Sequence, residues 1–101
     1  MEIVTLLDGV TGTATGTAKS MKKVMEEGNS DVRRYDFPIQ ISGITTATVI
    51  VQGSMDGTTY SPISGASWTA DGCSTLNVPF PYIQGKCTAH TTGTITMTIG
   101  I

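Results

Sequence analysis

The chain has 101 residues, which is enough for one domain with one hydrophobic core. Its formal net charge is −2 and only 14% of its residues are charged, whereas Thr occurs 18 times and Gly 12 times. This composition excludes a disordered chain, because there are enough apolar residues for a core. It also argues against a nucleic-acid partner, because phosphate binding by electrostatics requires a basic surface. We expect a single domain over residues 1–101.

The N-terminal third contains two short candidate strands and one candidate helix. Ile3–Leu7 and Thr13–Thr17 are rich in β-branched residues and flank an Asp8-Gly9 turn. Within Thr17–Glu27, apolar residues recur at helical spacing, and Gly28 follows. This pattern predicts at most one short helix there, and a long loop is the alternative.

Four segments show a regular alternation of polar and apolar residues, which is typical of strands with one buried face. In chain order they are Arg34–Ile41, Ala47–Ser54, Tyr82–Ala89 and Thr94–Ile101. Pro38 has no N–H to donate and therefore predicts a sheet edge or a bulge in the first segment.

Shorter candidate strands lie between these segments, separated by Asp-Gly turns and prolines. They are Thr59–Ile63, Ser67–Ala70 and Ser74–Val78. About eight short strands at this spacing predict an all-β fold, an antiparallel β-sandwich of jelly-roll or immunoglobulin-like type.

The sequence offers no arrangement of residues for catalysis. His90 is the single histidine, and no Gly-x-Ser-x-Gly motif places a serine for nucleophilic attack. The Gly-rich stretch from residue 9 to 17 lacks the Lys of a phosphate-binding loop. We therefore expect a structural or binding protein with no cofactor, and not an enzyme.

Metal binding is not expected either. Cys73, Cys87 and His90 are potential zinc ligands, with Asp71 as a fourth, but Cys87 and His90 fall on opposite faces of a continuous strand. The segment 56–59 lacks the dense acidic spacing of a calcium loop and is typical of a hairpin turn.

The two cysteines leave two alternatives open. In a reducing cytosol, Cys73 and Cys87 would be free thiols and behave as small buried hydrophobic residues. In an oxidising medium they would be able to form a disulfide, within one chain or between chains.

An interface is expected on the outward faces of the strands. Ile50 is an apolar residue on the polar face of its strand, and Tyr60 and Trp68 are aromatic residues with no basic neighbours in the sequence. These two aromatics would fill the core, form an interface or stack on a sugar. The candidate interface residues are Ile50, Gln52, Tyr60, Trp68, Tyr82 and Gln84.

The start of the chain carries neither the basic residues nor the long apolar stretch of a signal peptide. No apolar run approaches the roughly 20 residues that span a bilayer. We expect synthesis in the cytoplasm and no membrane partner.

The block Ala47–Tyr60, in which Gly-Ser-Met-Asp-Gly-Thr follows a strand, resembles a pattern of small virion proteins of tailed bacteriophages. The step Pro79-Phe80-Pro81-Tyr82-Ile83-Gln84 and the Thr-rich strand 93–99 fit the same pattern, as do 6–10 and 13–18. The segment from Lys19 to Arg34 has no counterpart. Related proteins often have Arg where this chain has Gln84.

The resemblance implies a virion structural protein made in the host cytoplasm. Its expected role is capsid decoration or stabilisation, with many copies bound to the major capsid protein or other virion proteins and with homo-oligomers in the particle. A tail or head-fibre component is the nearest alternative. A carbohydrate-binding or adhesion module that uses Trp68 and Tyr60 is the other.

Overall fold

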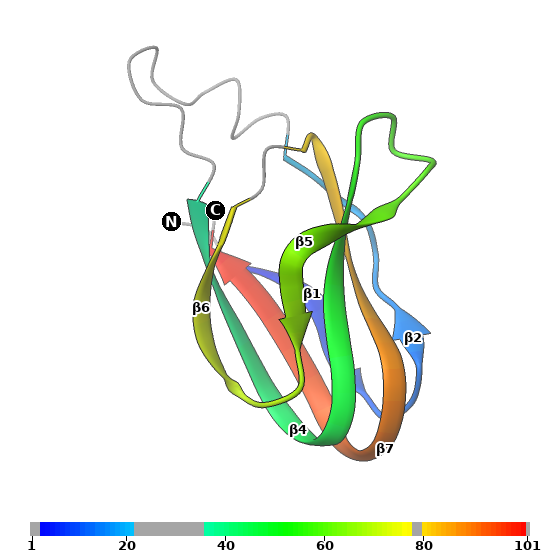
Figure 1. Ribbon diagram of the computed structural model, residues 1–101, viewed down its shortest axis with the longest axis vertical. Helices are drawn as coiled ribbons and strands as arrows, with labels where there is room; N and C mark the ends of the chain where they lie inside the picture. The colour runs from blue at the N-terminus through cyan, green and yellow to red at the C-terminus, as the bar shows by residue number, and fades with distance from the viewer. Residues whose placement is uncertain (1–2, 22–35, 78–79, 101) are drawn as a thin grey trace.

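The computed structural model describes residues 3–21, 36–77 and 80–100 (Figure 1). Within these ranges the protein is all-β, with seven strands in one antiparallel sheet and no helix. The strands are β1 (Ile3–Val10), β2 (Ala14–Thr15), β3 (Lys19–Ser20), β4 (Asp36–Ser54), β5 (Ser61–Trp68), β6 (Gly72–Asn77) and β7 (Tyr82–Gly100).

The sheet is organised around its two longest strands, β4 and β7. They pair antiparallel over most of their length, from Ile39 opposite Ile99 to Ser54 opposite Tyr82. Both strands bend sharply in the middle (Figure 1), and their neighbours change at the bend. The sheet therefore has two arms. One half of each long strand belongs to the first arm, and the other half belongs to the second.

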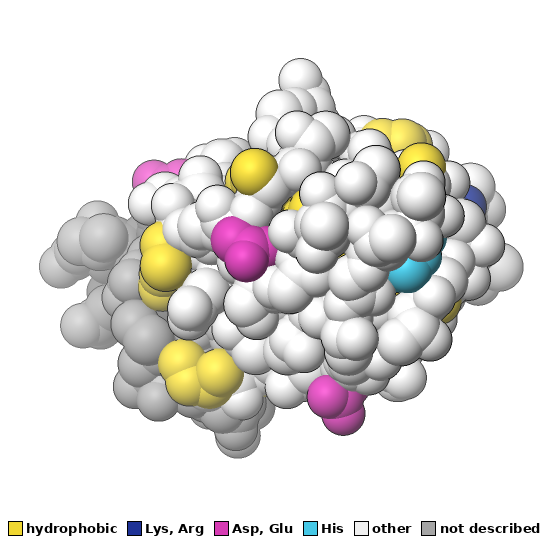
Figure 2. Space-filling model, turned by 90° about the horizontal axis from the view of Figure 1, so that it is seen from below, with side chains coloured by type: hydrophobic (Ala, Val, Ile, Leu, Met, Phe, Trp, Pro, Cys, Tyr) yellow, Lys and Arg dark blue, Asp and Glu magenta, His cyan; other side chains and the backbone are white. Residues whose placement is uncertain are grey.

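The first arm contains β6, residues 36–42 of β4, residues 95–100 of β7, and β1. The second arm contains β5, residues 47–54 of β4, residues 82–90 of β7, and the short strands β2 and β3. Figure 2 looks onto the bend between the arms, where most of the surface is neither charged nor hydrophobic.

Two glycines allow the bend. Gly43 has a φ of 85° and Gly93 a φ of 119°, a region that side-chain-bearing residues rarely adopt. A Cβ atom on Gly43 would collide with the carbonyl oxygen of Thr94, and one on Gly93 would collide with that of Gly43. The two paired backbones approach each other so closely here that neither position has room for a side chain.

Side chains satisfy backbone groups at places where the strand pairing is interrupted. The N–H of Ile44 donates to Asp71 Oδ1 over 2.7 Å, in the gap between β5 and β6. On the opposite side of the sheet, the N–H of Gly9 donates to Thr96 Oγ1 over 3.3 Å, where β1 has an irregular register with β7.

The hydrophobic core joins both arms. The inward-facing residues alternate along each long strand, as period-two patterning requires, and they belong to a single cluster with residues of β1, β5 and β6. The buried hydrophobic residues are Leu6, Leu7, Met21, Phe37, Ile39, Ile41, Ala47, Val49, Val51, Ala66, Leu76, Ile83, Cys87, Ile95, Met97 and Ile99. The buried residues of both arms therefore belong to one core.

The all-β prediction is confirmed, but the division into strands differs. Arg34–Ile41 and Ala47–Ser54 were expected to be separate strands, yet the described part of both belongs to β4; likewise Tyr82–Ala89 and Thr94–Ile101 both contribute to β7. The sequence suggests a break because Gly and Thr interrupt the alternation. In the structure, the register between β4 and β7 shifts at these residues, and the two strands remain paired on both sides of the shift.

The predicted helix at Thr17–Glu27 is wrong for the residues that the structure describes. Residues 17–21 are not helical, and Lys19–Ser20 form β3 opposite Ile83 and Tyr82. The N–H of Met21 donates to the Pro81 carbonyl over 2.6 Å, and the Met21 side chain is buried. Pairing with β7 and burial of Met21 outweigh the weak helical periodicity. Residues 22–27 lie outside the described ranges.

The bend predicts a large difference between two glycine substitutions. Gly65 has a φ of 80°, close to that of Gly43, but open space where its Cβ would lie. We expect Gly65→Ala to lower the free energy of unfolding by about 1 kcal/mol, from backbone conformation alone. Gly43→Ala adds the collision with Thr94 and should cost about 3 kcal/mol or more.

Urea unfolding of both variants and the parent protein, followed by circular dichroism, measures the two losses. Equal losses for Gly43→Ala and Gly65→Ala would show that the close backbone approach at the bend does not constrain residue 43.

Candidate docking surface

The outward face of the second arm brings together four of the six candidate interface residues. Gln52 on β4 lies directly opposite Gln84 on β7, and the neighbouring pairs are Ile50 with Lys86 and Ser54 with Tyr82. Directly opposed residues on one face are close enough for their side chains to contact. The four candidate residues on this face are each half-buried, and we call them the second-arm face: Ile50, Gln52, Tyr82 and Gln84.

The strands beside β4 and β7 extend the second-arm face with small and uncharged residues. On β5, Ser67 lies opposite Ile50 and Pro62 opposite Gln52. On the other side, Thr15 of β2 lies opposite Lys86. Lys86 is thus the charged member of a face otherwise made of neutral residues, which matches the depletion of charge in the centre of protein interfaces.

The loop from Ser54 to Tyr60 stands at the end of this face and is ordered by two side chains. Ser54 Oγ accepts hydrogen bonds from the N–H groups of Asp56 (3.3 Å) and Gly57 (2.9 Å) and donates to Asp56 Oδ1 (2.9 Å). The same carboxylate oxygen accepts from the N–H groups of Thr58 (2.8 Å) and Thr59 (2.9 Å). These bonds are typical of Asx turns, and they hold the loop in one conformation.

The hydrogen bonds also determine the acidity of Asp56. Bonds from the Thr59 and Thr58 N–H groups, followed by the Ser54 hydroxyl, stabilise the carboxylate and lower the pKa of Asp56 from 3.8 to about 2. Asp56 is therefore ionised at any physiological pH and keeps its role as acceptor.

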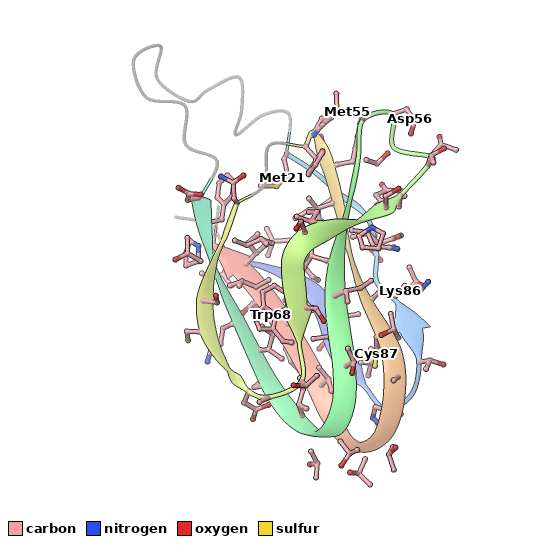
Figure 3. All side chains as sticks on the ribbon, in the orientation of Figure 1. Met21, Met55, Asp56, Trp68, Lys86 and Cys87 are labelled. Carbon is pink, nitrogen blue, oxygen red and sulfur yellow. The ribbon has the colours of Figure 1, made fainter. Side chains whose placement is uncertain are left out.

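The ordered loop presents Met55 to solvent and packs on aromatic rings. Met55 is 74% exposed (Figure 3). A Cβ atom on Gly57 would lie 3.5 Å from the Tyr82 ring, so the loop backbone covers this ring closely. A Cβ on Gly53 would come within 2.8 Å of the Phe80 ring. Beside them lies an open hollow of about 310 Å³, lined by loop residues, Ser61 and Phe80.

Tyr60 and Trp68 do not join the second-arm face. Trp68 lies opposite Val49, which points inward, and it packs partly buried against the core (Figure 3). Tyr60 precedes β5 at its other end, and its hydroxyl is buried without a hydrogen-bond partner. The two aromatic residues are thus separated by the length of β5 and form no common platform for a sugar.

The cysteines and the histidine occupy separate positions. Cys73 is an exposed free thiol opposite Gln40 in the first arm, and Cys87 is a buried free thiol opposite Val49 in the second arm. His90 Nε2 lies 2.7 Å from the Gly93 carbonyl oxygen, to which it donates. Among the described residues, no three His, Cys, Asp or Glu side chains are grouped so that they would hold a metal ion.

A second open hollow, of about 510 Å³, lies where β2 meets β7. Residues of β2 and β7 and their neighbours line it, among them Thr13, Thr15, Lys86, Thr88 and the buried Cys87. Lys86 therefore belongs both to this hollow and to the second-arm face.

Sequence reasoning missed Met55 and Phe80 as candidate contact residues. The 56–59 segment was interpreted as an ordinary turn, and a turn alone does not indicate that a neighbouring side chain is displayed. The available signal was a methionine placed between Ser54 and Asp56, because both flanking residues favour turn-forming hydrogen bonds and leave the intervening side chain outside.

Comparisons with protein-family models, with curated proteins and with solved structures found no match for this chain. The described part of the chain contains no helix that is long and apolar enough to cross a membrane.

The Asp56 hydrogen bonds predict the pH at which the loop loses its order. Because the pKa of Asp56 is lowered to about 2 in the folded protein, the carboxylate stabilises the loop fully above pH 3.8. This contribution should disappear as the pH falls from 3.8 through about 2. Two-dimensional NMR of the Thr58 and Thr59 amides, recorded from pH 6 downwards, measures the midpoint.

Asp56→Asn is the matched control, because its side chain keeps an oxygen acceptor but does not titrate. Its loop amide signals should not respond to pH in this range. A midpoint near 3.8 in the parent protein would contradict the proposed bonding.

Proposed function

We propose that this chain is a structural protein of a tailed-phage virion that decorates the capsid. In this proposal it has a β-sandwich fold and docks in many copies on the major capsid protein through the second-arm face and the 54–60 loop. The observation that carries the proposal is the combination of four half-buried neutral residues in register with an ordered loop that displays Met55.

Preorganisation supports a docking role. Association costs free energy when side chains and loops lose freedom on binding, about 0.5–1.5 kcal/mol for each flexible side chain that is immobilised. Here the loop is already held by Ser54 and Asp56, and Gln52 and Gln84 lie side by side in a paired sheet. The backbone of this surface is therefore already ordered before docking.

The chemical character of the surface supports a protein partner. Tyr, Met and other large apolar side chains are enriched in interface cores, and charged residues are depleted there. The second-arm face carries Ile50 and Tyr82, and the loop at its end exposes Met55, with mainly neutral neighbours. Glutamines between them supply hydrogen-bond donors and acceptors that give a docked complex its register.

Two of the segments that carry the phage resemblance also belong to this surface. The Gly-Ser-Met-Asp-Gly-Thr segment forms the ordered loop, and the Pro-Phe-Pro-Tyr segment supplies the Phe80 and Tyr82 rings on which it packs. The sandwich in our proposal corresponds to the two arms, whose inward faces share one core. A tail or head-fibre position would use the same surface, and labelling on particles distinguishes the locations.

In this proposal, binding to the particle also stabilises the folded state of the protein by mass action. A partner that binds the folded form alone stabilises it in proportion to the logarithm of its concentration. A small domain gains most from this, because its own core buries a limited fraction of the chain. A capsid lattice offers many identical partner sites at high local concentration.

Ile50→Lys tests the docking surface on particles that lack the protein. The new ammonium group lies directly opposite Lys86 and would be buried on docking, so we expect binding to weaken at least about tenfold. Co-sedimentation with the particles measures binding, and genome release on heating measures stabilisation. Thr91→Lys, with the same charge at an exposed position by the bend, is the control and should bind like the parent.

Particles that bind Ile50→Lys as tightly as the parent, or that retain their genome equally well without the protein, would contradict capsid stabilisation through this face.

A further inference from the structure

Lys86 is a half-buried cation beside the second-arm face. It lies on β7, opposite Ile50 on one side and Thr15 of β2 on the other (Figure 3). No hydrogen bond or ion pair joins its ammonium group to another residue in the described part of the chain. An ammonium group that loses water on docking requires an anionic partner, because an unpaired charge is costly where the dielectric constant is low. Lys86 is thus a position at which an interface needs an opposite charge.

The open hollow of about 510 Å³ at Lys86 offers hydrogen-bond donors, and we call it the Lys86 hollow. Its walls include Thr13 and Thr15, whose hydroxyls have no hydrogen bond to any residue within the described ranges. The hydroxyl of Thr88 donates to the Thr48 carbonyl over 3.4 Å. An ammonium group donates three hydrogen bonds and accepts none, and each free hydroxyl donates one more. The Lys86 hollow therefore suits a group that accepts several hydrogen bonds and donates none.

The other charged residues leave Lys86 as the charge of this hollow. Lys19 lies opposite the buried Ile83 and does not line it. The acidic residues that the structure describes do not line it either, and they are Asp8, Asp36, Asp56 and Asp71. The hollow is therefore positive on a chain whose formal net charge is −2, and charge complementarity selects an anionic occupant.

We propose that the docked partner places one carboxylate, from an Asp or Glu side chain, in the Lys86 hollow. This inference rests on the capsid role proposed above and names the chemistry that the partner presents to this surface. An ionised carboxylate accepts hydrogen bonds only, and those from an ammonium group are about twice as strong as bonds between neutral groups. A nucleic-acid phosphate chain is a poorer occupant, because it requires a row of cations and the hollow has one.

The carboxylate and the apolar contact at Ile50 occupy separate parts of the interface. The Lys86 hollow lies on the β2 side of β7, whereas Ile50 belongs to β4 on the other side of that strand. The ion pair thereby gives the docked complex its register, because the partner's carboxylate fits at one position along β7.

Lys86→Met tests the ion pair, because methionine keeps an apolar stem that packs on the sheet but carries no charge. We expect the dissociation rate from particles that lack the protein to rise about tenfold or more, as for a charge pair that is desolvated in the complex. Lys86→Gln, which is neutral and polar, should behave in the same way. Surface plasmon resonance on immobilised particles measures the rates, and circular dichroism checks that each variant folds.

Lys19→Met is the matched control, because it removes the same charge outside the Lys86 hollow. It should dissociate like the parent. Lys86→Arg keeps the charge and should dissociate within about threefold of the parent rate. Raising the salt concentration should accelerate dissociation of the parent more than that of Lys86→Met, because salt screens only the complex that contains the pair.

The inference is overturned if both neutral variants at position 86 dissociate at the parent rate, or if Lys19→Met dissociates as fast as they do. It is also overturned if these variants slow association alone, which would indicate long-range attraction instead of a pair in the interface. A parent protein that does not bind the particles contradicts the capsid role itself. In every other outcome the parent binds, so failure of the carboxylate contact and failure of the capsid role are distinguishable.

Discussion

The close approach of β4 and β7 at Gly43 and Gly93 is the constraint on which the rest of the structure depends. At this point the two backbones are so near that neither residue can carry a side chain, and both adopt positive φ angles. The bend turns one long two-stranded ribbon into two arms whose buried residues belong to one core. Without it, the inward residues of β4 and β7 would line one side of an extended ribbon and remain in contact with water.

The bend also separates the molecule into two outward surfaces with different character. The second arm ends in a loop ordered by Ser54 and Asp56, which exposes Met55 and covers the Tyr82 ring at Gly57. The first arm has one exposed isoleucine, Ile3, and beside it a small recess at Gly100. Because the arms share a core, their outer faces point away from it, and one surface can be occupied while the other stays accessible.

Sequence reasoning predicted the class of fold well, because period-two alternation is a direct consequence of strand geometry. Ile95, Met97 and Ile99 were correctly expected on one face, as were Val49 and Val51. It failed where a glycine had two interpretations. Gly43 and Gly93 are equally typical of a turn and of a bulge. The pairing of Ser42 with Thr96 on one side of them, and of Thr46 with Thr92 on the other, shows that the strands continue. It also failed at Lys19–Ser20, where pairing with β7 decides the conformation.

The candidate docking surface could be predicted in part. Alternation along the strands is enough to find four of its residues, namely Ile50, Gln52, Tyr82 and Gln84. The exposure of Met55 depends on hydrogen bonds that the sequence does not show.

The position of β7 in the sheet has a consequence for biosynthesis. This strand pairs with β1, β2, β3 and β4, and it is the last of the seven to leave the ribosome. Ile3 finds its partner at Gly100 and Ile39 at Ile99, so most of the pairing joins residues that are far apart in the chain. A sheet with such non-local pairing folds slowly, because the chain must lose the entropy of loop closure before the stabilising contacts between the strands form. The nascent chain therefore emerges with β4 lacking its main partner, and the sheet closes only after translation has reached β7.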